Sequence, residues 1–439
     1  MKDRPRSHAQ RGKAKRAAPA SRIVELEIAA VGARGDGVAN LSGEAVFVPF
    51  TVAGDRVLAR IEGRRGEGLA AALIEVLAPG PDRVPALCPH YARCGGCSLQ
   101  HLADQAYAAW KRELLVTQLA RHGLGAAPVE PLVRVAPGSR RRAAFAFMRR
   151  RNDTLLGFHA RASHAVIDVE TCPLMAPEPI GLLPPLRRML SAVVPEGGGD
   201  VVATLTEGGL DVLVEAEARL DLFDRERLAA FADENDLARL SWRRPGSGVI
   251  DPVARRHAPV VRFAGVAVEP PPGAFLQPTG AGERAIAERV ADAVGDARTV
   301  ADLYSGCGSF TMPLAAPGRI VHAVEGEDAS VRALEAAARQ AGLGVTAEVR
   351  DLARRPLLSH ELGRFQAVVL DPPRAGAVAQ AEQLASAGPP AVVAVSCNPA
   401  TLARDLRILV DGGYRLDSVT PIDQFPWSAH LEAVAVLRR

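Results

Sequence analysis

Short apolar runs alternate with polar residues along residues 23–79, as is typical of β-strands. Four such runs stand out, and Gly-containing turns such as GARGDG and LSGE separate them: IVELEI, AVFVPF, RVLARI and AALIEV. Short strands with frequent turns predict a small OB-like β-barrel of about five strands.

The pattern is less regular over residues 80–280. The Pro-rich linker APGPDRVP leads to a group of cysteines and then to the helical stretch AYAAWKRELLVTQLARHG. Strands are predicted at AAFAFM, DVLVEA and VVRFAG. We therefore expect a central α/β region here.

From residue 281 to residue 439, apolar strands alternate with helical stretches. The predicted strands are TVADLY, RIVHAVE, VTAEVR, FQAVVLD and PAVVAVS, and the helix DASVRALEAAARQAGL lies between the second and the third. This alternation predicts a parallel, doubly wound, Rossmann-like sheet. Ligands of such sheets bind at the carboxyl ends of the strands.

A chain of 439 residues can bury more than one core, which agrees with several domains.

Charged residues are distributed unevenly along the chain. Residues 1–22 carry eight basic residues against Asp3, whereas the rest of the chain has 45 basic and 49 acidic groups. We expect residues 1–22 to be a disordered tail that either attracts nucleic-acid phosphates or is solvated without a role.

The distribution of apolar residues also bears on location. No apolar run reaches the roughly 18 residues of a membrane span, and the N-terminal residues lack the apolar stretch of a signal peptide. We expect a cytoplasmic monomer without a membrane partner.

The first strand of the C-terminal region ends in DLYSGCGSF, residues 302–310, in which Gly306 permits a tight turn close to a ligand. Glu325, at the end of the second strand, could accept both hydroxyls of a ribose. Asp351, after the third strand, could meet an adenine amino group. A nicotinamide site would usually place a third glycine at the start of the helix, where Phe310 and Thr311 stand, so the loop favours S-adenosylmethionine over a dinucleotide.

Cys397 ends the fifth strand of this region, in SCNPAT. The fourth strand ends in DPPRAG, and both tips should face one crevice. By itself Cys397 is as compatible with a buried apolar residue as with a nucleophile. A third segment, DQFPWSAHLE, precedes the last strand and contains Glu432.

Together DPPRAG, SCNPAT and DQFPWSAHLE resemble the signatures of the RNA uracil-C5 methyltransferase family, a class I family that uses S-adenosylmethionine. The resemblance implies that Cys397 is the nucleophile and Glu432 the base. It also implies that Gln277 of AFLQPT contacts the cofactor. The expected cofactor-binding residues are Gln277, Tyr304, Gly306, Ser309, Glu325, Asp351 and Asp371.

Three positions depart from the family pattern. Thr279 replaces an asparagine, Ala394 replaces a tyrosine, and Trp427 replaces Gln, His or Tyr. These changes could alter base stacking or target choice, but they leave Cys397 and Glu432 in place.

The chemistry of uracil explains why the family needs both residues. Carbon 5 is a poor nucleophile until a thiolate adds to C6. After methyl transfer a base must remove the C5 proton so that the thiolate can leave. A base stacked in folded RNA cannot reach the crevice, so the target nucleotide must be flipped out.

Four further cysteines suggest a metal site: Cys88, Cys94, Cys97 and Cys172. Four thiolates fit structural zinc or a [4Fe-4S] cluster, and free thiols are the remaining possibility. Zinc sites usually consist of two close pairs, so three clustered cysteines and one distant cysteine favour the iron–sulfur cluster. The sixth cysteine, Cys307, is expected to be structural.

Two segments point to RNA. GDGVANLSGEAVFVPFTVAGDRV resembles the TRAM module, an RNA-binding barrel, although a purely structural barrel fits too. SRRRAAFAFMRRR, residues 139–151, is either a hairpin that grips phosphates or a solvated hairpin with basic ends.

The barrel and the cysteines together resemble the branch of the family that methylates 23S rRNA. A tRNA uridine methyltransferase is the alternative. A non-catalytic RNA-binding protein is disfavoured by the intact Cys397 and Glu432, and a cytosine-C5 methyltransferase by the lack of Pro-Cys or Thr-Cys at the tip of the fourth strand.

Overall fold

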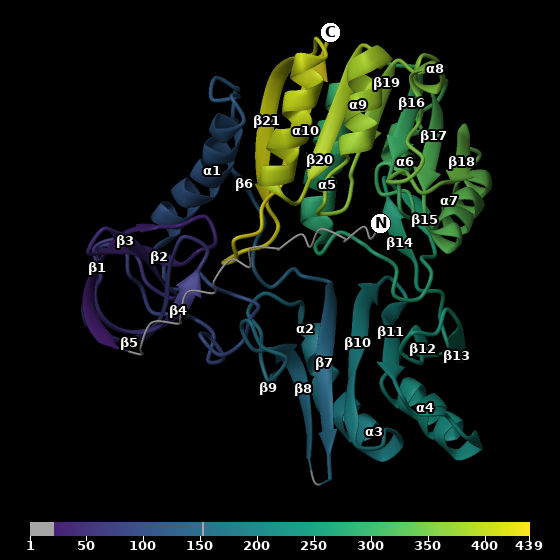
Figure 1. Cartoon of the computed structure of the whole chain (residues 1–439). Coiled ribbons are helices and arrows are strands. Elements are labelled where there is room, and N and C mark those ends of the chain that lie inside the picture. Colours follow the sequence, from purple (N-terminus) through teal and green to yellow (C-terminus); the bar gives the residue numbers. More distant parts are fainter. Residues whose placement is uncertain (1–21, 152) are drawn as a thin grey trace, which may run out of the picture. The chain divides into compact units, whose positions relative to one another are not determined.

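The computed structural model describes residues 22–151 and 153–439. These residues belong to two compact units, which divide after Val84. The predicted basic tail lies outside the described residues except for Arg22. Figure 1 shows the elements of each unit.

The first unit is a closed five-stranded barrel. Its strands follow one another around the barrel in the order β1-β2-β3-β5-β4. Their bounds are β1 Ile23–Val31, β2 Gly37–Leu41, β3 Glu44–Val48, β4 Arg56–Arg65 and β5 Gly68–Ala78. Val46, Val57 and Ile61 are fully buried inside it. The predicted barrel is therefore confirmed, with β2 as the strand that the four apolar runs did not include.

Gly37, the last residue of GDG, is the first residue of β2. A Cβ added at this position would lie 1.9 Å from Thr51 Oγ1, so only glycine allows the two segments to approach so closely.

The second unit, residues 85–439, begins with helix α1 (Asp104–Arg121) and contains two large sheets. The first sheet has seven strands in the order β13-β12-β11-β10-β7-β8-β9. The strand bounds are β7 Arg142–Arg150, β8 Asp153–His159, β9 Val166–Asp168, β10 Gly197–Thr206, β11 Gly209–Ala216, β12 Arg239–Arg243 and β13 Ile250–Arg255. Helices α2 (Pro177–Gly181), α3 (Leu183–Val193) and α4 (Leu222–Glu234) accompany it.

One buried cluster joins this sheet to its helices. Phe145 and Val212 from the strands pack with Leu186 from α3 and Phe231 from α4. The predicted strands AAFAFM and DVLVEA are β7 and β11, and VVRFAG contains the short strand β14 (Val261–Phe263), which pairs with β15 (Val266–Val268).

The second sheet has eight strands in the order β18-β17-β16-β19-β20-β22-β21-β6. Their bounds are β6 Val133–Arg134, β16 Thr299–Leu303, β17 Ile320–Glu325, β18 Val345–Val349, β19 Ala367–Leu370, β20 Ala391–Ser396, β21 Arg415–Asp423 and β22 Glu432–Arg438. The five predicted strands are β16 to β20, and they are parallel.

One edge of the sheet adds strands to the five predicted parallel ones. β22 runs antiparallel to β20 and to β21, and β6 joins β21 from a distant part of the chain. An antiparallel hairpin needs only a short connection, so the chain can reverse after β21 without another crossover helix.

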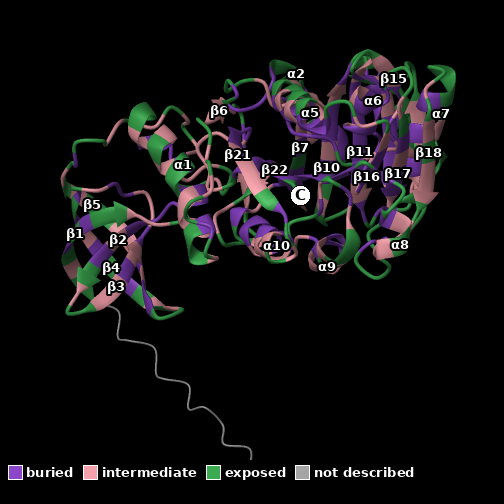
Figure 2. Ribbon diagram, turned by 90° about the horizontal axis from the view of Figure 1, so that it is seen from above, coloured by how far each residue is buried: buried purple, intermediate pink, exposed green. Residues whose placement is uncertain are grey.

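Helices cover both faces of the eight-stranded sheet, which gives the three layers of a Rossmann-like fold. Helices α1, α9 and α10 share one buried cluster with the sheet, and α5 shares another. The bounds are α5 Gly280–Val294, α6 Thr311–Leu314, α7 Asp328–Gln340, α8 Ser359–Leu362, α9 Val378–Ala387 and α10 Pro399–Asp411. Figure 2 shows the buried strands between these partly exposed helices.

None of the helices within the described residues is long and apolar enough to cross a membrane.

Candidate active site

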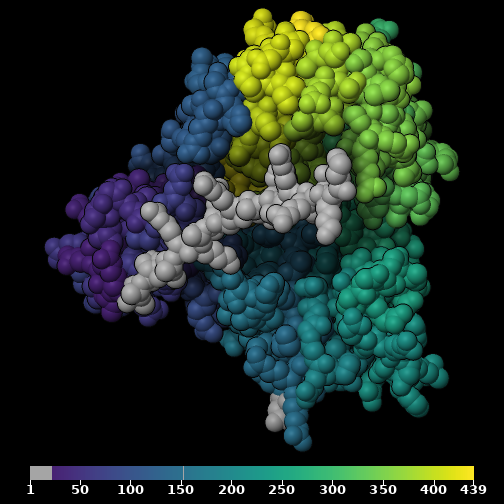
Figure 3. All heavy atoms as spheres, in the orientation of Figure 1, coloured from purple at the N-terminus to yellow at the C-terminus, as the bar shows by residue number. Residues whose placement is uncertain are grey.

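A pocket of about 1000 Å³ lies at the carboxyl ends of the parallel strands. The segments that follow β16, β17, β18, β19 and β20 all contribute to its lining, as does the loop before β22. Figure 3 shows the surface of residues 85–439 hollowed between the yellow-to-green part and the teal part. The strand tips therefore meet at one site, as expected for this kind of sheet.

The glycine loop after β16 is held by a carboxylate of the next strand. Glu325 Oε2 accepts a hydrogen bond of 3.0 Å from Gly306 N, and its Oε1 accepts bonds from Gly326 N and Glu327 N. Tyr304 and Gly306 have positive φ angles of 63° and 54°. The backbone thus turns sharply here, which glycine tolerates easily.

Six of the seven residues expected to bind the cofactor line this pocket. They are Gln277, Tyr304, Gly306, Glu325, Asp351 and Asp371. Ser309 lies in the same loop but is not part of the lining.

The carboxylates of Asp371 and Glu432 both line the pocket, and their charges interact. Burial raises the pKa of Glu432 to about 7, although a hydrogen bond from Gln424 acts in the opposite direction. Burial also raises the pKa of Asp371 well above its usual value, and the nearby charges of Glu432 and Asp302 raise it further. A carboxyl group with a pKa near neutrality is suited to proton transfer.

Cys397 lines the same pocket and is half-buried. Burial raises the pKa of its thiol to about 11, and the charges of Glu432 and Asp371 act in the same direction. Arg374, which also lines the pocket, lowers it. The pocket therefore combines a thiol, two carboxyl groups and a guanidinium group.

Sequence reasoning missed Gln424, which links these groups. Its Nε2 donates to Glu432 Oε2 at 2.8 Å and to Gln277 Oε1 at 2.7 Å. Gln277 Nε2 in turn lies 3.3 Å from Asp371 Oδ2. The only sequence signal was the position of Gln424 inside DQFPWSAHLE.

Helix α1 supports the loop that precedes Glu432. Lys111 Nζ donates to Asp423 Oδ1 at 2.8 Å and also donates to the carbonyl of His430. Tyr107 donates its hydroxyl to Asp423 Oδ2 and accepts a bond from Trp427 N, at 2.7 and 2.8 Å. The loop is thus held at both ends by two side chains of one helix.

The three departures from the family pattern occupy different places. Trp427 has a positive φ of 56°. Its carbonyl accepts bonds from the backbone of Ser98 and Leu99, which directly follow residues 88–97, called here the cysteine segment. Thr279 caps α5 by accepting a bond of 3.0 Å from Gly282 N. Ala394 is buried within β20.

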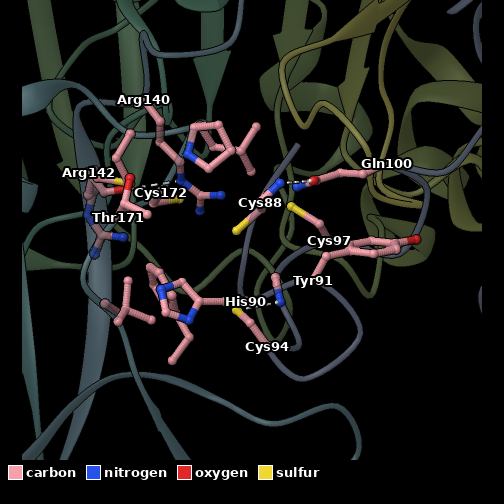
Figure 4. A pocket seen from close by; sticks show the side chains of 17 residues that line it. Cys88, His90, Tyr91, Cys94, Cys97, Gln100, Arg140, Arg142, Thr171 and Cys172 are labelled. Carbon is pink, nitrogen blue, oxygen red and sulfur yellow. Dashed lines mark hydrogen bonds between the residues drawn. The ribbon is translucent and has the colours of Figure 1, made fainter. Parts of the chain in front are cut away.

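A smaller pocket of about 240 Å³ is lined by the four candidate metal ligands, which are Cys88, Cys94, Cys97 and Cys172. Figure 4 shows how they approach one space from two segments of the chain. Burial raises the pKa of Cys97 to about 12 and raises those of Cys94 and Cys172. Among the described residues, no group of His, Cys, Asp or Glu is arranged to hold a metal ion.

The first arginine triplet of SRRRAAFAFMRRR makes internal contacts. Arg141 forms a 2.6 Å ion pair with Glu283, and Arg142 donates to the carbonyls of Gly273 and Ala274. Arg140 lines both the cysteine pocket and the larger pocket. This triplet is therefore not the solvated end of a hairpin.

Comparisons with known proteins agree with these features. A family model described as tRNA (Uracil-5-)-methyltransferase matches residues 266–439. An uncharacterized RNA methyltransferase of Brucella suis is 45% identical over 95% of this chain and 99% of its own length. The 23S rRNA (uracil(1939)-C(5))-methyltransferase of Alkalilimnicola ehrlichii is 35% identical over 94% of this chain and 96% of its own length.

The fold also has a solved counterpart. The tRNA (uracil-54, C5)-methyltransferase of Pyrococcus abyssi, in complex with S-adenosyl-L-homocysteine, aligns with a TM-score of 0.72 at 23% identity and covers 94% of this chain and 100% of its own. Because relatives above 30% identity span almost the whole sequence, the chain belongs to the family of S-adenosylmethionine-dependent RNA uracil-C5 methyltransferases.

Proposed function

We propose that this enzyme methylates C5 of a flipped-out uridine in 23S rRNA through a covalent bond between Cys397 and C6. The observation that carries the proposal is that Cys397, Glu432 and Asp371 line one pocket together with the glycine loop. A thiol, a base and a cofactor loop in one cavity are what this chemistry requires.

We assign the glycine-loop side of the pocket to S-adenosylmethionine. Glu325 would accept the ribose hydroxyls, and Asp351 would face the adenine amino group. The remaining contacts are assigned to Gln277, Tyr304, Gly306, Ser309 and Asp371. The bound cofactor supplies a methyl group on a positively charged sulfonium.

Cys397 begins the reaction as a thiolate. Because its pKa is about 11 without ligands, a neighbouring positive charge is needed to favour the thiolate. The charge of Arg374 already acts on this pKa, so the further positive charge would be that of the bound sulfonium. The thiolate would add to C6, and the electron pair that this places on C5 would take up the methyl group. The bond between the methyl carbon and the sulfonium sulfur would break, and S-adenosyl-L-homocysteine would leave.

Glu432 completes the cycle. With a pKa of about 7 it can accept the C5 proton near neutral pH. The electron pair of the C5–H bond forms the C5=C6 double bond, and the C6–S bond breaks to release Cys397. Asp371 would hold the uracil edge or the cofactor.

The proposal of 23S rRNA rests on the name of the 35% identical relative and on the TRAM-like sequence of the barrel. The barrel would bind RNA beyond the target nucleotide, in the cytoplasm. The tRNA alternative is supported by the description of the family model and by the name of the Pyrococcus abyssi protein.

We further propose that Cys88, Cys94, Cys97 and Cys172 hold a [4Fe-4S] cluster. Zinc would need all four sulfurs at about 2.3 Å from one point, whereas each thiolate of a cubane binds a different iron. All four thiols line one cavity of about 240 Å³, and this shared cavity is the observation that supports a cluster. Arg140, which lines the cavity, would offset part of the negative charge.

The mechanism is tested with RNA that contains 5-fluorouridine. Fluorine at C5 leaves no proton for Glu432 to remove, so the covalent adduct should persist during denaturing electrophoresis. We expect an adduct with 23S rRNA and cofactor, none with tRNA, and none for Cys397→Ala. Binding of S-adenosylmethionine to the variant checks that it is folded.

Two results would count against the proposal. An adduct that persists in Cys397→Ala would exclude this nucleophile. An adduct with tRNA but not with 23S rRNA would replace the proposed substrate by the alternative.

A further inference from the structure

Gln424 is a buried amide that directly follows β21 and is 1% exposed. Its Nε2 donates to Glu432 Oε2 at 2.8 Å and to Gln277 Oε1 at 2.7 Å. Both hydrogens of this amide nitrogen are therefore used. One donor thus connects the proposed base to a proposed cofactor contact.

The two carboxylate oxygens of Glu432 differ in their hydrogen bonding. Oε2 accepts the bond from Gln424, whereas Oε1 is buried and has no hydrogen-bond partner among the described residues. Glu432 itself lines the active-site pocket. A buried acceptor without a partner is costly, so such an atom in a pocket suggests a partner that arrives with the substrate.

From this geometry we propose that Gln424 is a positioning residue, which holds Glu432 by Oε2 so that Oε1 takes the proton from C5 of the uracil. This inference rests on the proposed role of Glu432 as the base. The elimination is balanced as before: Oε1 gains the proton, the C5=C6 bond forms, and Cys397 leaves C6 with the electron pair.

The N-terminus of α5 leaves room for this amide. A Cβ at Gly282 would lie 2.6 Å from Gln424 Oε1 and 2.9 Å from Gln424 Cβ. Gln424 Oε1 is buried without a partner among the described residues, next to Gly282. The reverse orientation would put two acceptors together while Glu432 is ionised, so the observed orientation suits the form that acts as a base.

The hydrogen bond also acts on the titration of Glu432. Burial raises the pKa of this group to about 7, and the bond from Gln424 opposes the rise because it stabilises the carboxylate. The titratable groups that interact with the charge of Glu432 are Asp371 after β19 and Cys397 after β20. The hydrogen bond to Glu432 within the described residues comes from Gln424. Without Gln424 the pKa of Glu432 should therefore be higher.

The test uses natural uridine RNA and S-adenosylmethionine with a labelled methyl group. Gln424→Met keeps the volume of the side chain but removes the donor. We expect turnover to slow by about tenfold or more, as for loss of a bond to a charged group. Because only elimination is impaired, the variant should accumulate a labelled protein–RNA adduct on denaturing gels.

The pH profile gives a second readout. Turnover requires ionised Glu432, so the acidic limb of the profile should move to higher pH in Gln424→Met. The matched control is Gln380→Met, which removes an equally buried glutamine from α9. It should change stability without adduct accumulation and without a shift of the acidic limb.

Glu432→Gln distinguishes the proposed role of Glu432 as the base from the proposed role of Gln424 in positioning it. If this variant does not accumulate the adduct, the proposed base is wrong and the inference falls with it. If it does, while Gln424→Met turns over with the original pH profile and no adduct, Gln424 does not position the base. Weakened cofactor binding without adduct in Gln424→Met would also overturn the inference.

Discussion

Cys397 lies where burial and neighbouring carboxylates disfavour a thiolate. Its thiol is half-buried beside Glu432 and Asp371, and its pKa is about 11. Thiolates, not thiols, are the reacting species. In the free enzyme this residue should therefore react slowly with electrophiles at neutral pH, which would protect it from damage between cycles.

We predict that alkylation of Cys397 by iodoacetamide in the free enzyme accelerates throughout the range from pH 7 to about 10, because the thiolate fraction keeps rising below its pKa. At pH 8.5 Glu432→Gln should react faster, since removal of a negative charge lowers the pKa of the thiol. Peptide mass spectrometry measures the rate.

The matched control is Glu113→Gln, which changes an exposed carboxylate on α1. It should leave the rate unchanged. A wild-type rate that levels off below pH 9 would contradict the raised pKa.

At the scale of elements, helix α1 is more than a connection. It follows the cysteine segment in the sequence, yet Leu115 and Leu119 pack into the core of the eight-stranded sheet. Its Lys111 is fully buried and pairs with Asp423 at the end of β21. A charge buried in this way depends on its partner, because removal of one member leaves the other unpaired.

We predict that Lys111→Met lowers the free energy of unfolding by about 3–5 kcal/mol, since Asp423 is left buried without its cation. Urea denaturation measures the loss. Arg332→Met breaks the exposed pair with Asp328 on α7 and should cost less than about 1 kcal/mol. Equal losses of unfolding free energy in both variants would show that burial of the ion pair does not determine its contribution to stability.

At the scale of the whole molecule, the cysteine pocket joins distant segments of the second unit. Cys88, Cys94 and Cys97 lie before α1, whereas Cys172 lies between β9 and α2. Arg140, Gly96 and Leu174 line both this pocket and the active-site pocket. A bound cluster would therefore stabilise the wall between the two pockets.

We predict that protein purified without oxygen is brown and contains about four iron atoms per chain. Cys172→Ser should lose most of this iron and unfold at a lower temperature, because one corner of the cluster loses its ligand. Cys307→Ser changes a cysteine outside the pocket and should retain the iron. Colourless wild-type protein with one zinc per chain would overturn the cluster.

The local spacing of apolar residues predicted many of the strands and helices of this molecule. The barrel, the parallel strands β16 to β20 and α1 followed from the spacing of apolar residues, because each pattern spans only a few neighbouring positions. The antiparallel edge did not follow, since β6 is too short to have a pattern and acquires its place only by pairing with β21.

The sequence by itself determined which residues can do chemistry: motifs at the ends of parallel strands must converge at one edge of the sheet, so Cys397, Glu325 and Asp371 could be placed together in advance. Only the tertiary structure decided how they are held. Lys111 and Asp423 are 312 positions apart, and Gln424 and Gln277 are 147 apart, so no local pattern links them. Which oxygen of Glu432 is left free depends on these distant contacts, because burial and hydrogen bonding exist only once the chain has folded.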